Sequence, residues 1–206
     1  MRPRYIILII FPLIITFLGC SKRMMVRKFY FLSSPEITQK SDNAAQSHLP
    51  YRCLLLPTSV LSAYDIPKIA LRTNSHEIEY FLYHQWTSTP SHMFTEIIQK
   101  FFQKQRLFRE IDLHIEKQDV AFQMESDVIS IEIIRRENIW LAHLQMYLAL
   151  KTYPDEKILI SHEFDRTTPL LKRNINLFVD ALQKILEKEL TLFYEKIKEE
   201  LIRPQK

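Results

Sequence analysis

Seven histidines and two cysteines are the side chains of this 206-residue chain best suited to catalysis or metal binding. His76-Glu77 and His162-Glu163 both lack the second histidine, at helical spacing, that a His-Glu-x-x-His zinc site requires. His162 and Asp165 are close in sequence, but residues three apart on a strand point to opposite faces. We therefore expect no metal site and no enzyme. A hydrolase whose serine approaches His84 or His162 in the folded chain is the alternative.

The glycine content excludes three further kinds of site. The single glycine of the chain is Gly19, so none follows it. Phosphate-binding loops and the dinucleotide fingerprint need glycine for close backbone approach, and the hydrolase nucleophile elbow needs it for a strained turn. We therefore expect no cofactor, and we expect turns built from other residues, as at Arg136-Glu137-Asn138 and Tyr153-Pro154-Asp155.

The charge balance argues against nucleic acid as a partner. The chain has 28 basic and 24 acidic residues, and without Arg2 and Arg4 the excess falls to two. Nucleic-acid binding requires a clustered basic patch, and the sequence has none.

The first residues have the pattern of a secretory signal peptide. Arg2 and Arg4 precede an apolar run from Tyr5 to Leu18, and the small residues Gly19-Cys20-Ser21 follow it. One alternative is an uncleaved signal anchor, but the run is shorter than the roughly 20 residues of a bilayer span and Pro12 interrupts it. The other alternative is a buried core helix.

The end of this leader resembles the lipobox of bacterial lipoproteins. In the sequence Thr16-Phe17-Leu18-Gly19-Cys20, the thiol of Cys20 would be diacylated and Cys20 would become the mature N-terminus. Acyl chains contribute about 0.8 kcal/mol per buried methylene, so two or three of them anchor a protein stably. Ser21 stands where an Asp would be the usual inner-membrane retention signal, and by resemblance to that rule we expect the periplasmic face of the outer membrane. The expected organisation is a signal peptide (1–19), a basic tether (20–27) and one domain (28–206).

The domain alternates between strand and helix patterns. Residues 90–105 follow the helix-start signal Ser88-Thr89-Pro90, and residues 174–202 carry an apolar stripe. The heptad pattern fails at Glu189, so a coiled coil is the minor alternative for the last helix. The helix at 174–202 is longer than one sheet face needs, so its final turns are candidates for contact with a partner. We expect strands at 28–32, 51–56, 67–72, 77–86, 129–133, 140–150 and 158–164, with one short strand within 107–123 and a loop at 36–50. In the run at 129–133 we expect Ile129, Ile131 and Ile133 to share one face.

These elements predict the fold class. The last three runs are joined by short polar turns and predict an antiparallel meander. We expect a single layered α+β domain, an antiparallel-dominated sheet with the two main helices on one face. In the strand at 77–86 we expect one face to hold Ile78, Tyr80, Leu82, His84 and Trp86. Cys53 has no partner if Cys20 is lipidated, and its apolar surroundings predict a buried thiol.

The residues resemble the ABC-type transport auxiliary lipoproteins, and within them the paraquat-inducible protein C group. The resemblance lies in Cys20, the Y-x-L-x-x-P-like stretch Tyr30 to Pro35, the segment Tyr64 to Arg72, Glu79-Tyr80 and Trp86. It implies a non-catalytic component of a transporter of the mammalian-cell-entry (MCE) type, which moves lipid between the inner and outer membranes. The partners so implied are the membrane, reached through the acyl chains, an MCE-domain protein and phospholipid; a homo-oligomer is a further alternative.

Four residues are candidates for the binding or partner surface. Tyr30 and Trp86 are by base rate strand residues that pack in the core, and the functional alternative is that they line an apolar groove or a partner surface. Arg72 is by base rate a surface or ion-paired residue at a strand end, and the functional alternative is contact with a lipid phosphate or an acidic partner. Tyr80 completes the set. Two other functions stay open: a carrier whose own cavity holds an acyl chain, and an assembly lipoprotein for an outer-membrane β-barrel.

Overall fold

A long antiparallel meander forms the frame of the computed structural model, which describes residues 26–35, 49–116 and 119–202. Strands β7 (Val120–Arg136), β8 (Ile139–Thr152) and β9 (Ile158–Pro169) pair in chain order, as predicted. The turn from β7 to β8 uses Glu137 at φ 47°, so a non-glycine residue takes the left-handed conformation that a tight hairpin needs. The leader, Cys20 and most of the predicted loop 36–50 lie outside the described residues.

The other edge of β7 is covered by short strands. In order along β7, three strands pair with it in parallel: β2 (Leu49–Leu55), β3 (Ser59–Val60) and β4 (Lys68–Asn74). Strand β6 (Phe108–Asp112) extends the sheet beyond β2. Strand β5 (Glu77–Trp86) pairs antiparallel with β4, and β1 (Lys28–Tyr30) pairs in parallel with β5 as the edge strand. The result is one α+β domain whose sheet is mostly antiparallel and has several parallel pairs.

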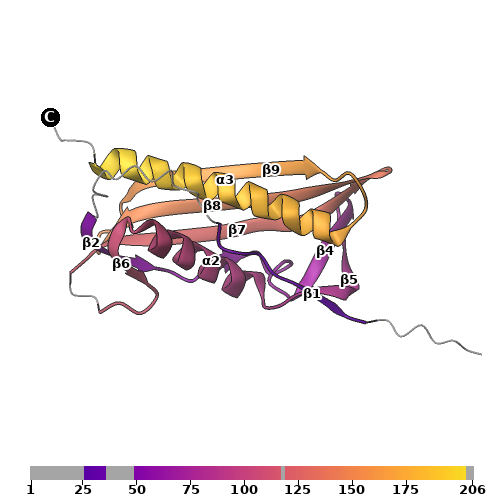
Figure 1. Ribbon diagram of the computed structural model, residues 1–206, viewed down its shortest axis with the longest axis horizontal. Helices are drawn as coiled ribbons and strands as arrows, with labels where there is room; N and C mark the ends of the chain where they lie inside the picture. The colour runs from indigo at the N-terminus through magenta and orange to yellow at the C-terminus, as the bar shows by residue number, and fades with distance from the viewer. Residues whose placement is uncertain (1–25, 36–48, 117–118, 203–206) are drawn as a thin grey trace, which may run out of the picture.

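Two helices cover one face of this sheet, as predicted. Helix α2 (Pro90–Gln105) and helix α3 (Ile175–Ile202) lie side by side on the same side of the strands (Figure 1). The apolar stripe of α3 is buried against β8 and β9, so the sheet takes the place of a coiled-coil partner. The aromatic rings of the two helices meet in the core, where the ring centroids of Phe102 and Phe193 are 6.1 Å apart. No helix in the described ranges is both long and apolar enough to cross a bilayer.

A β-bulge changes the phase of β7. Val128 pairs with Met146 and Ser130 with Gln145, so Ile129 is an extra residue on this strand. Before the bulge the even-numbered residues face the helices, and after it Ile131 and Ile133 do. Ile129 is therefore 37% exposed, and the prediction that it shares a face with Ile131 and Ile133 is wrong.

Strand β5 also departs from the predicted alternation. Lys68 pairs with Gln85 but Ala70 pairs with Tyr80, so several residues of β5 bulge out between these two points. Trp86 consequently faces the helices, whereas Tyr80 points to the other face and Leu82 is 61% exposed. The predicted single face of Ile78, Tyr80, Leu82, His84 and Trp86 is wrong for this reason.

Three smaller differences concern strand ends. The strand predicted at 28–32 ends at Tyr30, the one predicted at 51–56 begins at Leu49, and the short strand β3 was not expected. The ambiguous stretch 107–123 contains β6 and also the start of β7. Cys53 is fully buried, as predicted, and burial raises the pKa of its thiol.

Candidate functional surface

The helix-free face of the sheet holds a buried charge. Glu132 of β7 has no exposed surface, and its carboxylate accepts hydrogen bonds from Tyr64 Oη (2.7 Å) and Arg72 Nε (2.8 Å). His143 of β8 lies across the strand pair, with Nδ1 at 3.0 Å from the same carboxylate and Nε2 at 3.0 Å from Asp165. We call these five residues the Glu132 network. A fully buried carboxylate is stable only with such donors, so the network joins the segment before β4 to the meander.

The ionisation of the network follows from these contacts. Burial alone would raise the pKa of Glu132, but hydrogen bonds from His143, Arg72 and Tyr64 outweigh it and the pKa is lowered. Burial alone would lower the pKa of His143, but hydrogen bonds to Glu132 and Asp165 outweigh it and the pKa is raised. The hydrogen bond to Glu132 raises the pKa of Arg72. The arrangement is a charged pair of Arg72 and Glu132, with an imidazole that gains a proton readily.

Ser130 gives this network the composition of a catalytic triad but not its geometry. Its Oγ lies 3.4 Å from Nδ1 and 3.5 Å from Nε2 of His143. Nearly equal distances to both ring nitrogens do not fit a single in-plane hydrogen bond. Both nitrogens are also closer to a carboxylate, so no nitrogen is available as a base for Ser130.

The second buried histidine is held between the sheet and α3. His162 Nε2 lies 2.8 Å from Glu189, whose other oxygen accepts a 2.7 Å hydrogen bond from Arg166 Nε. Lys196 Nζ lies 2.9 Å from His162 Nδ1. Burial lowers the pKa of His162 and outweighs the hydrogen bond to Glu189, which acts in the opposite direction. His162 and Asp165 lie on opposite faces, as predicted from their spacing. In the described ranges no group of three or more His, Cys, Asp or Glu side chains could hold a metal ion.

Two of the four predicted surface residues are paired, and the other two, Arg72 on β4 and Tyr80 on β5, lie on neighbouring strands at the same end of the sheet. Tyr30 and Trp86 are register partners of β1 and β5, and Tyr30 Oη lies 2.8 Å from His84 Nδ1. Trp86 is 2% exposed and packs 6.0 Å from Phe178 of α3, so it is a core residue. Arg72 is engaged by Glu132 and by Tyr64, to whose Oη its Nη2 donates a 2.6 Å hydrogen bond.

Tyr80 is the most accessible of the four. Its side chain lies on the helix-free face, 39% exposed, and its hydroxyl donates to the carbonyl of Ala63. Glu132 and His143 were not predicted, because each stands in an alternating run at a position expected to face solvent. The signal that would have identified them is their cross-strand pairing, which requires the register of β7 on β8.

Three surface hollows among the described residues border α2. One of about 650 Å³ is lined by Ser33, Ser34 and the polar side of the helix, including Lys100. A second, of about 300 Å³, continues from Ser33 to Phe31 and Thr87. A third, of about 460 Å³, lies beside β2 and β6. None of these three is an enclosed apolar chamber.

The comparisons with known proteins show a shared fold. A scan against protein-family models finds no match for this chain, and no curated protein matches it in sequence. Among solved structures, protein XCC0632 from Xanthomonas campestris, of the family DUF330, has a TM-score of 0.66 at 16% identity, covering 85% of this chain and 95% of that one. An uncharacterised protein has a TM-score of 0.61 at 10% identity, covering 84% and 99%. The hypothetical protein CT253 from Chlamydia trachomatis has a TM-score of 0.49 at 8% identity, covering 74% of this chain and 98% of that one. The first two have the fold of this chain over nearly their whole length.

Proposed function

We propose that this chain is a lipid-anchored envelope protein that serves, without catalysis, as the auxiliary component of an MCE-type ABC lipid transporter. Cys20 carries the acyl chains, and the domain works at the periplasmic face of the outer membrane. The MCE-domain protein is the partner that the domain binds, and phospholipid is the transported cargo.

The observation that carries the proposal is that residues in which the sequence resemblance lies contact one another in the fold. Tyr30 and Trp86, 56 positions apart in the sequence, are register partners at the edge of the sheet. Tyr64 and Arg72, the two ends of another resembling segment, are hydrogen-bonded to each other and to Glu132. Scattered positions that contact one another are expected of residues that define a family's structure. The shared fold with the DUF330 protein supports the same assignment at the level of architecture.

The carrier alternative has less support. A lipid carrier requires an enclosed apolar chamber of several hundred Å³, and the three hollows around α2 are open and flanked by charged side chains such as Lys100. The core between sheet and helices is instead filled by aromatic rings, including Phe101, Phe102 and Phe193.

Affinity purification of the full chain from detergent-solubilised envelopes tests the proposal. We expect an MCE-domain protein to co-purify with the wild-type chain and to be depleted with the Cys20→Ser variant, which cannot be acylated. Recovery of an outer-membrane β-barrel in place of an MCE-domain protein would favour the assembly role. Bound phospholipid in native mass spectrometry of the purified chain alone would favour the carrier.

A further inference from the structure

One end of the domain gathers the features of a membrane-contacting surface. Figure 1 shows strand β1, the turn between β7 and β8 and the loop between β9 and α3 at the same end of the long axis. We call this the tether end. Its exposed apolar side chains are Val26 (64% exposed), Phe29 (59%), Leu82 (61%), Ile139 (53%) and Leu171 (95%).

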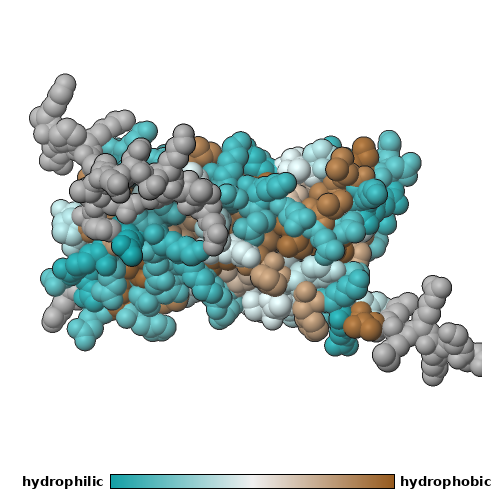
Figure 2. Space-filling model, in the orientation of Figure 1, coloured by the Kyte–Doolittle hydropathy of each residue, from teal (hydrophilic) through white to brown (hydrophobic). Residues whose placement is uncertain are grey.

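The point at which the chain leaves this end is fixed. Strand β1 is paired with β5, and just beyond it the backbone N–H and carbonyl of Ser33 are both bound by Gln183 of α3, at 2.9 and 2.8 Å. Figure 2 shows hydrophobic side chains at this end of the molecule.

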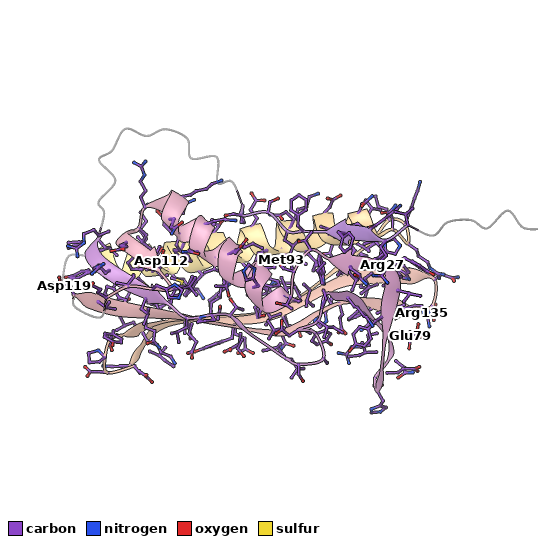
Figure 3. All side chains as sticks on the ribbon, turned by 90° about the horizontal axis from the view of Figure 1, so that it is seen from below. Arg27, Glu79, Met93, Asp112, Asp119 and Arg135 are labelled. Atoms are coloured by element: carbon purple, nitrogen blue, oxygen red, sulfur yellow. The ribbon has the colours of Figure 1, made fainter. Side chains whose placement is uncertain are left out.

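Cations surround these apolar side chains. Arg27 and Lys28 flank Val26 and Phe29 in sequence, Arg136 precedes the β7–β8 turn, and Lys172 and Arg173 follow Leu171. Figure 3 shows Arg27 and Arg135 at this end, with Asp112 and Asp119 at the other. Exposed apolar side chains mixed with cations are the composition that binds the headgroup region of an anionic bilayer.

The surface is built from separate elements held together. Arg173 Nη2 donates to the carbonyl of Glu137 at 3.1 Å and to Asn138 Oδ1 at 3.2 Å, which joins the β9–α3 loop to the β7–β8 turn. Arg135 pairs with Glu79 at 3.6 Å, which joins β7 to β5. The apolar side chains of three elements therefore keep fixed positions relative to one another.

We propose that the tether end lies directly against the phospholipid surface, so that the domain stands on the membrane instead of hanging free from its tether. This inference rests on the proposed lipidation of Cys20. The six Cα–Cα steps from Cys20 to Val26 can span at most about 22 Å when fully extended, so the anchor keeps the tether end closer to the bilayer than any other described part of the domain. The opposite end, with the β8–β9 turn, then points away from the membrane.

The chain offers a matched pair of isoleucines to test this orientation. Ile139 and Ile158 are exposed to nearly the same extent, 53% and 52%, and each is the first residue of its strand at opposite ends of the sheet. Cys53 is fully buried and Cys20 would be acylated, so a cysteine introduced at 139 or 158 is the single site for a fluorescent label. The lipidated protein is reconstituted in vesicles of phosphatidylethanolamine and phosphatidylglycerol that contain a headgroup quencher.

We expect the label in I139C to be quenched several-fold more than the label in I158C. Equal quenching on protein retained by the vesicles would overturn the docking proposal alone. Loss of the wild-type protein from the vesicles would overturn the lipoprotein proposal and this one with it. Energy transfer between labels at position 139 in detergent would show that a second copy of the chain covers the tether end, and would also overturn it.

Discussion

At the scale of single residues, the structure distinguishes side chains that hold the fold from those free to meet a partner. Arg72 and Trp86 belong to the first group, because one neutralises the buried Glu132 and the other packs on Phe178. Tyr80 is open to solvent on one side, and Tyr30 contacts His84 at the sheet edge. A partner role for Arg72 therefore competes with its role in the Glu132 network, and the two roles predict different results.

Replacing Arg72 with Met should lower the free energy of unfolding by about 1.5–3 kcal/mol, because a buried carboxylate loses a charged donor. Chemical denaturation measures this change. In the double variant R72M/E132Q the loss should be smaller than the sum of the two single losses, because the uncompensated charge is gone. If Arg72 instead binds a lipid phosphate or an acidic partner, R72M would leave stability unchanged and weaken co-purification.

The two buried histidines should give opposite pH dependences of stability. The pKa of His143 is raised in the fold, so its contribution is complete below the unfolded value of about 6.5 and is lost as pH rises through the folded pKa. The pKa of His162 is lowered, so its contribution is present above about 6.5 and is lost as pH falls through the folded pKa. Urea titrations of wild type, H143N and H162Q across this range measure both differences. If H143N and H162Q changed the pH dependence of the free energy of unfolding in the same direction, the assigned contacts would be contradicted.

At the scale of elements, residue spacing predicted the two helices and the antiparallel meander. Helix α2 begins at Pro90 as expected, and the alternation of β8 from Ala142 to Leu150 places every second residue in the core. The phase of β5 and β7 could not be predicted, because a bulge arises from pairing with other strands and leaves no local pattern. Ile129 shows this: its apolar side chain fits the alternation in sequence but is the inserted residue.

The candidate surface was predicted in part. The resemblance selected Tyr30, Arg72, Tyr80 and Trp86. The structure pairs Tyr30 with Trp86 and places Arg72 and Tyr80 on the neighbouring strands β4 and β5. Glu132 and His143 were missed, since a polar residue in an alternating strand normally faces water. Their contacts come from other segments: Tyr64, before β4, bonds to the carboxylate of Glu132, and Asp165 of β9 bonds to His143.

Truncating Trp86 should show that the edge of the sheet is part of the core. We expect W86A to lose about 3–5 kcal/mol of stability, because the cavity beside Phe178 cannot close. Phe31, which is 65% exposed, is the aromatic control, and F31S should change stability by less than about 0.5 kcal/mol. Thermal and chemical denaturation compare the two. If W86A lost little free energy of unfolding, Trp86 would again be a candidate for the partner surface.

At the scale of the whole molecule, the proposal combines an N-terminal segment that resembles a lipidation signal with a domain that has a defined tether end. The helices close one face of the sheet and the Glu132 network ties together the other. Such a domain is suited to bind a partner at a fixed height above a membrane. The proposed work in lipid transport depends on this attachment.

Intact-mass measurement of the protein purified from bacterial envelopes tests the attachment most directly. The account predicts a chain that begins at Cys20 and carries the mass of two or three acyl chains, and a Cys20→Ser variant that lacks this mass. A wild-type chain that retains residues 1–19, or one with an unmodified Cys20, would contradict it.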